Sequence, residues 1–89
     1  MIKEQLTIIN KLGLHARAAA KLVGVAGRYE SRIKLIKDGR DADAKSIMSV
    51  MMLAATQGTE LGIEIEGPDA DEAWDALLNL VQDRFGEPE

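Results

Sequence analysis

Residues 60–67, ELGIEIEG, alternate between apolar and polar positions over most of their length. Leu61, Ile63 and Ile65 fall on one face, while glutamates occupy most of the other. A period of two residues is typical of a β-strand with one buried and one solvated face. Sheets with a charged outer face are usually antiparallel, because parallel sheets are covered on both faces. This stretch therefore predicts an antiparallel sheet that is covered on one side only.

Three further stretches have the same one-sided character, at residues 2–9, 31–37 and 40–44. The last two are separated by Asp38-Gly39, a pair that tolerates positive φ at both positions and favours a two-residue hairpin turn. Four strands are therefore expected, two of them joined as a hairpin.

Three helices are expected between and after these strands. The first begins near residue 16 and stops at Gly27, with a buried stripe of Ala19, Leu22, Val23 and Ala26. The second runs from an N-cap at Ser46 to Gly58. The third covers residues 69–85, opens with the capping-box spacing of Asp69 and Glu72, and buries Ala73, Leu77, Leu80 and Val81. The order βαββαβα predicts one α+β domain over residues 1–89.

The composition excludes several classes of function. A net charge of −4 and only three aromatic residues argue against nucleic acid as a partner. No apolar run approaches the ~18 residues that a membrane span requires. The chain has no cysteine, which fits a reducing cytoplasm and rules out thiolate metal sites. With a single histidine we expect no metal, and without a nucleotide-binding motif we expect no cofactor.

That histidine, His15, precedes the first predicted helix at its N-cap position. A lone histidine is most often a surface or structural residue. Here, however, the helix N-terminus offers free N–H groups and roughly half a positive charge. Arg17 adds a planar guanidinium that suits phosphate oxygens. The positive field favours the neutral imidazole, so the residues point to a phosphoryl acceptor beside an anion-binding helix end.

Three segments of the chain resemble the bacterial histidine-containing phosphocarrier (HPr) family. They are GLHARAA at 13–19, KSIMSVMMLA at 45–54 and TQGTEL at 56–61. The resemblance implies an open-faced β-sandwich, with a four-stranded antiparallel sheet and three helices on one face. It also implies that His15 accepts phosphate on Nδ1 from phosphorylated enzyme I. The phosphate then passes to the A component of an enzyme II of the phosphoenolpyruvate-dependent phosphotransferase system.

The resemblance also assigns roles to neighbouring positions. Arg17 matches the arginine beside the active histidine, and the backbone of residues 16–18 (Ala16, Arg17 and Ala18) is expected to bind phosphate. Ser46 matches the serine that an HPr kinase/phosphorylase modifies in many bacteria. Two departures stand out: Ala18 replaces a proline and adds an N–H donor, and Gly24 replaces a lysine. Because the chain continues past Phe85, a C-terminal carboxylate at the site is not expected.

The second predicted helix is rich in methionine. We assign Val50, Leu53 and Ala54 to the core, since core packing is the usual role of apolar side chains at helical spacing. A short helix on an open sheet cannot bury every side, and methionine suits surfaces that meet several partners. We therefore expect a partner interface formed by Ala20, Ile47, Met48, Met51 and Met52.

Two other functions compete with that of a monomeric phosphocarrier. One is a regulatory binding module of the same fold without phosphoryl transfer, which the intact His15–Arg17 pair disfavours. The other is a ferredoxin-like nucleic-acid or ligand-binding domain, which the acidic charge and scarce aromatics disfavour. Sugar uptake and the parallel nitrogen-related regulatory branch both accommodate this sequence.

Overall fold

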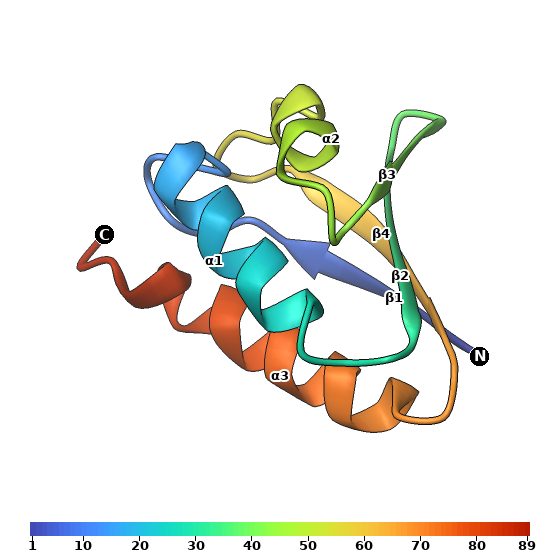
Figure 1. Cartoon of the computed structure of the whole chain (residues 1–89). Coiled ribbons are helices and arrows are strands. Elements are labelled where there is room, and N and C mark those ends of the chain that lie inside the picture. Colours follow the sequence, from blue (N-terminus) through green and yellow to red (C-terminus); the bar gives the residue numbers. More distant parts are fainter.

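The four strands form one antiparallel sheet in the order β1-β4-β2-β3 (Figure 1). The computed structural model describes residues 1–89. The strands are β1 (Ile2–Thr7), β2 (Arg32–Lys37), β3 (Arg40–Asp43) and β4 (Glu60–Glu66). The two sheet neighbours of β4 lie far from it in sequence, so the sheet joins all parts of the chain.

The alternation of β4 is confirmed as the centre of the core. Leu61, Ile63 and Ile65 are at most 1% exposed. Their cross-strand neighbours on β1 and β2 are also buried, with Leu6 opposite Leu61 and Leu35 opposite Ile63. The opposite face of the sheet carries charged and polar side chains and is not covered by any helix.

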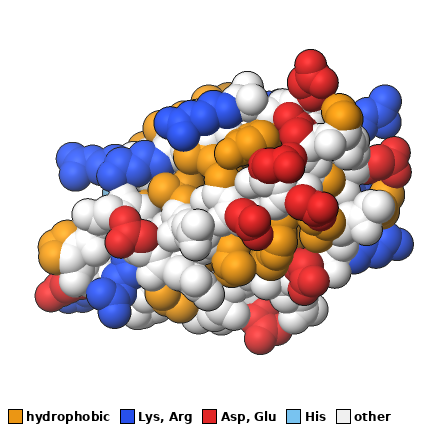
Figure 2. Space-filling view, turned by 90° about the horizontal axis from the view of Figure 1, so that it is seen from below, with side chains coloured by type: hydrophobic (Ala, Val, Ile, Leu, Met, Phe, Trp, Pro, Cys, Tyr) orange, Lys and Arg blue, Asp and Glu red, His pale blue; other side chains and the backbone are white.

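The helices are α1 (Ala16–Ala26), α2 (Ile47–Met52) and α3 (Ala70–Gln82), followed by a 3-10 turn, η1 (Arg84–Gly86). All three lie on one face of the sheet, with α1 and α3 running alongside each other (Figure 1). This arrangement confirms the predicted open-faced α+β fold. On the α3 side, acidic side chains occupy the middle of the surface and basic ones lie toward its edges (Figure 2).

The hairpin prediction is also confirmed. Asp38 and Gly39 have φ angles of 51° and 79°, and they join β2 to β3. Two consecutive left-handed residues match the right-handed twist of the flanking strands, which is why this residue pair is favoured there.

The predicted extent of the second helix is wrong. Helix α2 ends at Met52, with Leu53 as its C-cap, and does not continue to Gly58. Ala54 has a φ of 51° and is exposed, so its assignment to the core is also wrong. The Lys37 ammonium donates to the carbonyls of Leu53 (2.9 Å) and Ala54 (3.3 Å), which satisfies acceptors at the helix end.

The capping prediction for α3 is wrong as well. Asp69 is the N-cap residue, but its side chain makes no cap hydrogen bond. Its carboxylate instead accepts hydrogen bonds from the Glu30 N–H (2.9 Å), the Ser31 N–H (2.9 Å) and the Ser31 hydroxyl (2.6 Å). These bonds tie the loop after α1 to the loop before α3. Two predicted core residues, Val23 and Leu80, are only partly buried because they lie at the margins of their helix faces.

Candidate functional site

His15 is the N-cap residue of α1, as predicted. Its backbone is extended (φ −71°, ψ 177°), and its carbonyl accepts the Ala19 N–H at 2.8 Å. The preceding Leu14 is held against the loop after α2 by a 2.8 Å hydrogen bond from its N–H to the Ala55 carbonyl. The imidazole is partly accessible, with 28% of its side chain exposed.

The first turn of α1 presents three unpaired donors. The N–H groups of Ala16, Arg17 and Ala18 have no acceptor within the protein. Ala18 is fully buried, backbone included, so its N–H lies at the helix end without being open to solvent, unlike the exposed Ala16 and Arg17. Proline at this position would remove that donor. The helix N-terminus therefore combines free donors with the positive end of the helix dipole.

His15 and Arg17 line one open depression together with Ala16. Its other walls come from the loop before α1, through Lys11 and Leu12, and from the C-terminal tail, through Glu87, Pro88 and Glu89. The Arg17 guanidinium makes no hydrogen bond or ion pair with any protein group. A planar cation without a partner beside unpaired N–H groups can bind an anion such as a phosphoryl group.

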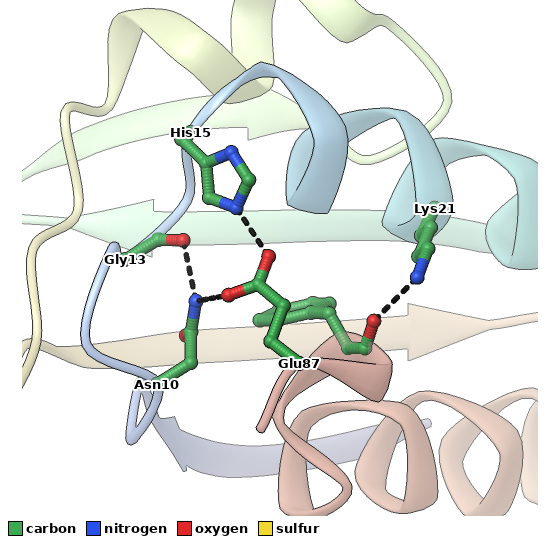
Figure 3. Close-up of polar contacts among 6 residues, drawn as sticks. Asn10, Gly13, His15, Lys21 and Glu87 are labelled. Atoms are coloured by element: carbon green, nitrogen blue, oxygen red, sulfur yellow. Dashed lines mark hydrogen bonds and ion pairs between the residues drawn. The ribbon is translucent and has the colours of Figure 1, made fainter. Parts of the chain in front are cut away.

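Glu87 is a site residue that sequence reasoning missed. Its Oε2 contacts Nε2 of His15, while its Oε1 accepts a 2.9 Å hydrogen bond from Nδ2 of Asn10 (Figure 3). The Glu87 side chain is only 11% exposed. Hydrogen bonds from Asn10 and then from His15 lower the pKa of Glu87. A separation of 72 residues between His15 and Glu87 leaves no local pattern that could have indicated this contact.

The contact with Glu87 distinguishes the two nitrogens of the imidazole. A carboxylate can only accept hydrogen bonds, so Nε2 of His15 must carry a proton. In the neutral ring, Nδ1 then holds a free lone pair. Nδ1 points away from Glu87 and has no hydrogen-bond partner within the protein (Figure 3).

The C-terminal tail is fixed by several contacts. Arg84 and Phe85 both adopt left-handed backbone conformations (φ 55°), which turn the chain after α3. Phe85 is fully buried, and its carbonyl accepts a 2.6 Å hydrogen bond from the Lys21 ammonium of α1. The Glu89 carbonyl accepts the Lys11 N–H at 2.8 Å. Glu87 is thus held between two anchored points of the tail.

The predicted interface residues are exposed. Met48 and Met52 are each 69% exposed, Ile47 and Met51 are 39% and 40% exposed, and Ala20 on α1 is also exposed. These five side chains are called the α1–α2 apolar surface below. Leu12, which is 66% exposed and lines the depression beside His15, was not singled out from the sequence.

Ser46 lies at the start of α2, where it was predicted to act as a cap. Its hydroxyl accepts a long hydrogen bond of 3.4 Å from the Ser49 N–H. No group of three or more potential metal-ligating side chains occurs in the protein. None of its helices has the length and apolar character needed to cross a membrane.

Comparisons with known proteins agree on one family. The family model for the PTS HPr component phosphorylation site matches residues 2–83. The phosphocarrier protein HPr of Cupriavidus necator is 57% identical over 89 residues, which cover both chains completely. That of Pseudomonas aeruginosa is 56% identical over 86 residues, or 96% of each chain. The crystal structure of HPr-C-His from Thermoanaerobacter tengcongensis superposes over the whole of both chains with a TM-score of 0.96 at 42% identity. On these matches, the chain belongs to the HPr family of phosphocarrier proteins.

Proposed function

We propose that Nδ1 of His15 accepts a phosphoryl group from phosphorylated enzyme I and passes it to the A component of an enzyme II in the cytoplasm. The observation that carries this proposal is the state of the His15 ring. Its Nε2 is engaged by Glu87, whereas Nδ1 is unpartnered at the open N-terminus of α1.

The residues at this site suit an in-line transfer. The Nδ1 lone pair would attack phosphorus, and a nitrogen–phosphorus bond would form as the bond from phosphorus to the donor atom of enzyme I breaks. The bonding pair returns to the donor. Negative charge on the three equatorial oxygens can be balanced by the N–H groups of residues 16–18 and by the Arg17 guanidinium. Transfer to the next protein reverses the same steps.

The direct test is a phosphorylation assay. The protein is incubated with phosphoenolpyruvate and enzyme I, and its intact mass is measured before and after mild acid treatment. We expect one acid-labile phosphate on the wild-type protein and none on His15→Ala. Labelling that survives this substitution would contradict the assignment to His15.

The same assay decides the alternative of a regulatory binding module. Such a module would bind partners without ever acquiring acid-labile phosphate. The ferredoxin-like alternative does not fit, because the HPr family model matches residues 2–83. An HPr dimer has been crystallised from Thermoanaerobacter tengcongensis. We propose that this chain acts as a monomer, and its mass in solution tests that point.

The α1–α2 apolar surface is proposed as the docking site for enzyme I and the enzyme II A component. Its large apolar side chains are exposed to solvent and do not pack into the core. Methionine side chains adapt to partners of different shape. Both partners would use one surface in turn, which suits a carrier that must release its donor before it meets its acceptor.

Ser46 is proposed as a regulatory phosphorylation site for an HPr kinase/phosphorylase. A phosphate there would add about −1.5 to −2 charges at the start of α2, where negative charge is tolerated. The same charge would lie beside the exposed side chains of Ile47 and Met48 and would lose solvent when a partner docks.

A phosphate mimic separates these two effects. We expect Ser46→Asp to melt no lower than Ser46→Ala but to accept phosphate from enzyme I more slowly. A wild-type transfer rate in Ser46→Asp would contradict the inhibitory role. If a cognate kinase with ATP adds no acid-stable phosphate, Ser46 serves as a helix cap alone.

A further inference from the structure

We infer that Asn10 and Glu87 form a tautomer lock for His15: Asn10 orients the Glu87 carboxylate, and Glu87 keeps the ring proton on Nε2 so that Nδ1 remains the nucleophile. The inference deepens the proposed function, on which its consequences for phosphoryl transfer rest. The tautomer itself is a property of the unphosphorylated protein and can be measured without any transfer.

The first element of the lock is the fixed orientation of Asn10. This side chain is fully buried, and its Nδ2 donates both to the Gly13 carbonyl (2.8 Å) and to Oε1 of Glu87 (2.9 Å). Both neighbours are acceptors only, so the Asn10 amide cannot flip without losing both bonds. Its own Oδ1 is buried without a hydrogen-bond partner, which is unfavourable.

The second element of the lock is that the two carboxylate oxygens of Glu87 have different partners. Because Asn10 occupies Oε1, Oε2 faces Nε2 of His15 (Figure 3). An ionised carboxylate at Oε2 requires a donor, which only the protonated Nε2 can supply. The opposite tautomer would place the lone pair of Nε2 against this negative charge. The lock therefore favours the one neutral form of the ring in which Nδ1 can attack.

The third element is the anchoring of the tail. Phe85 and Glu89, on either side of Glu87, are held by Lys21 and Lys11 respectively. Glu87 is therefore presented to the ring at a fixed position. Histidine rings whose proton is placed by a hydrogen-bonded carboxylate are a recurrent device for orienting a reactive nitrogen.

The lock also acts after transfer. When Nδ1 bonds to phosphorus while Nε2 keeps its proton, the ring gains a positive charge. The Glu87 carboxylate lies against Nε2 and stabilises that charge, whereas Arg17 and the N–H groups of residues 16–18 would bind the phosphoryl oxygens. Glu87 is thus a positioning residue, and it does not itself bond to the phosphoryl group.

Glu87→Gln provides the decisive test, because it should invert the lock. The Asn10 Nδ2 still needs an acceptor, so the carbonyl of the new amide takes the place of Oε1. Its NH₂ group then faces Nε2 of His15, which must accept, and the proton moves to Nδ1. Glu87→Ala removes the partner altogether and should give a mixture of tautomers. Glu66→Gln is the matched control, since it removes an exposed carboxylate at the end of β4, outside the depression beside His15.

The readout is the ¹⁵N chemical shift of both ring nitrogens in the unphosphorylated proteins, measured at a pH where the imidazole is neutral. We expect an unprotonated Nδ1 in the wild type and Glu66→Gln, and a protonated Nδ1 in Glu87→Gln. A wild-type tautomer in Glu87→Gln would overturn the inference. Thermal melting shows whether each variant is folded. If Glu87→Gln is not folded, Glu87→Ala supplies the comparison. A wild-type tautomer in Glu87→Ala would also overturn the inference.

The transfer assay gives a second ranking. Phosphate acceptance from enzyme I should be equal in the wild type and Glu66→Gln, slower in Glu87→Ala and slowest in Glu87→Gln, by tenfold or more. A Glu87→Gln protein that accepts phosphate as fast as Glu66→Gln would overturn the role of the lock in transfer. If the tautomers behave as expected but the wild type accepts no phosphate, the proposed function fails and the lock stands.

Discussion

Replacing Gly13 with alanine should disturb the segment that delivers His15 to the helix. Gly13 has a φ of 68°, in the left-handed region, and a Cβ placed there would lie 2.6 Å from the Ala55 carbonyl oxygen and 3.0 Å from Cα of Thr56. Both contacts are with backbone, so no flexible side chain can move aside. The alanine must push the loop after α2 away from residues 13–14.

The size of the effect can be worked from these contacts. A left-handed conformation costs a non-glycine residue about 1–2 kcal/mol. Displacing the loop also strains the 2.8 Å hydrogen bond between Leu14 and Ala55, with a net value of ~1 kcal/mol. Together they predict a loss of about 2–3 kcal/mol in the free energy of unfolding. For a domain of this size, that corresponds to a fall in Tm of roughly 10–25 °C.

Two other glycines allow the cost of a left-handed backbone to be separated from the cost of a steric clash. Gly39 also has a left-handed backbone (φ 79°), but a Cβ there meets nothing within 4 Å, so Gly39→Ala should lose only about 1–2 kcal/mol. Gly24 lies inside α1 with nothing within 4 Å, so Gly24→Ala should gain about 0.5–1 kcal/mol from helix propensity.

Denaturant unfolding of the three variants beside the wild type measures these differences. From the most to the least stable protein, we expect the order Gly24→Ala, wild type, Gly39→Ala and Gly13→Ala. A Gly13→Ala variant as stable as Gly39→Ala would refute the argument that the close approach to Ala55 constrains this position.

Three further predictions concern charged and apolar side chains. Arg17→Lys should change stability by less than ~0.5 kcal/mol but slow phosphoryl transfer, since the lysine loses the planar fork; equal transfer rates would contradict this. Met48→Asp should melt like the wild type yet bind enzyme I more weakly; unchanged affinity in an NMR titration would remove the docking proposal. Asp69→Asn should unfold more easily at pH 7. Hydrogen bonds from the Ser31 hydroxyl and the Glu30 N–H lower the pKa of Asp69 below 3.8, so its stabilising contribution is present above that pH and lost as the pH falls through the folded value. The difference between Asp69→Asn and the wild type should therefore shrink below pH ~4, and a difference independent of pH would count against the assignment.

Short-range patterns in the sequence were enough to predict the order of the elements and most of the residues that they bury. Alternation in residues 60–67 was enough to place Leu61, Ile63 and Ile65 in the core, because side chains on a strand point to opposite faces at every step. The Asp38-Gly39 turn followed from the backbone preferences of two adjacent residues. His15 at the mouth of α1 was predictable for the same reason, since a helix start depends on its immediate neighbours.

Local patterns failed where an element meets a segment that is distant in the sequence. Ser46 predicts the start of α2 correctly, but its end depends on Lys37 from β2 reaching the carbonyls of Leu53 and Ala54. Aspartate is a favoured N-cap residue, yet the Asp69 carboxylate accepts hydrogen bonds from the Glu30 and Ser31 N–H groups and the Ser31 hydroxyl instead. For Asp69, a contact between segments overrides a local capping preference worth only about 1 kcal/mol.

The environment of the imidazole is the clearest case. The sequence identified His15 and Arg17, because both lie within one turn of the same helix start. It held no sign of Glu87, which is 72 residues away and reaches the ring only because Arg84 and Phe85 turn the tail and Lys21 holds it. Local periodicity carries no information about such a meeting, since it arises from the packing of α3 beside α1. Local sequence was thus enough to propose a reactive histidine, whereas the proposed choice of its reactive nitrogen depends on the folded chain.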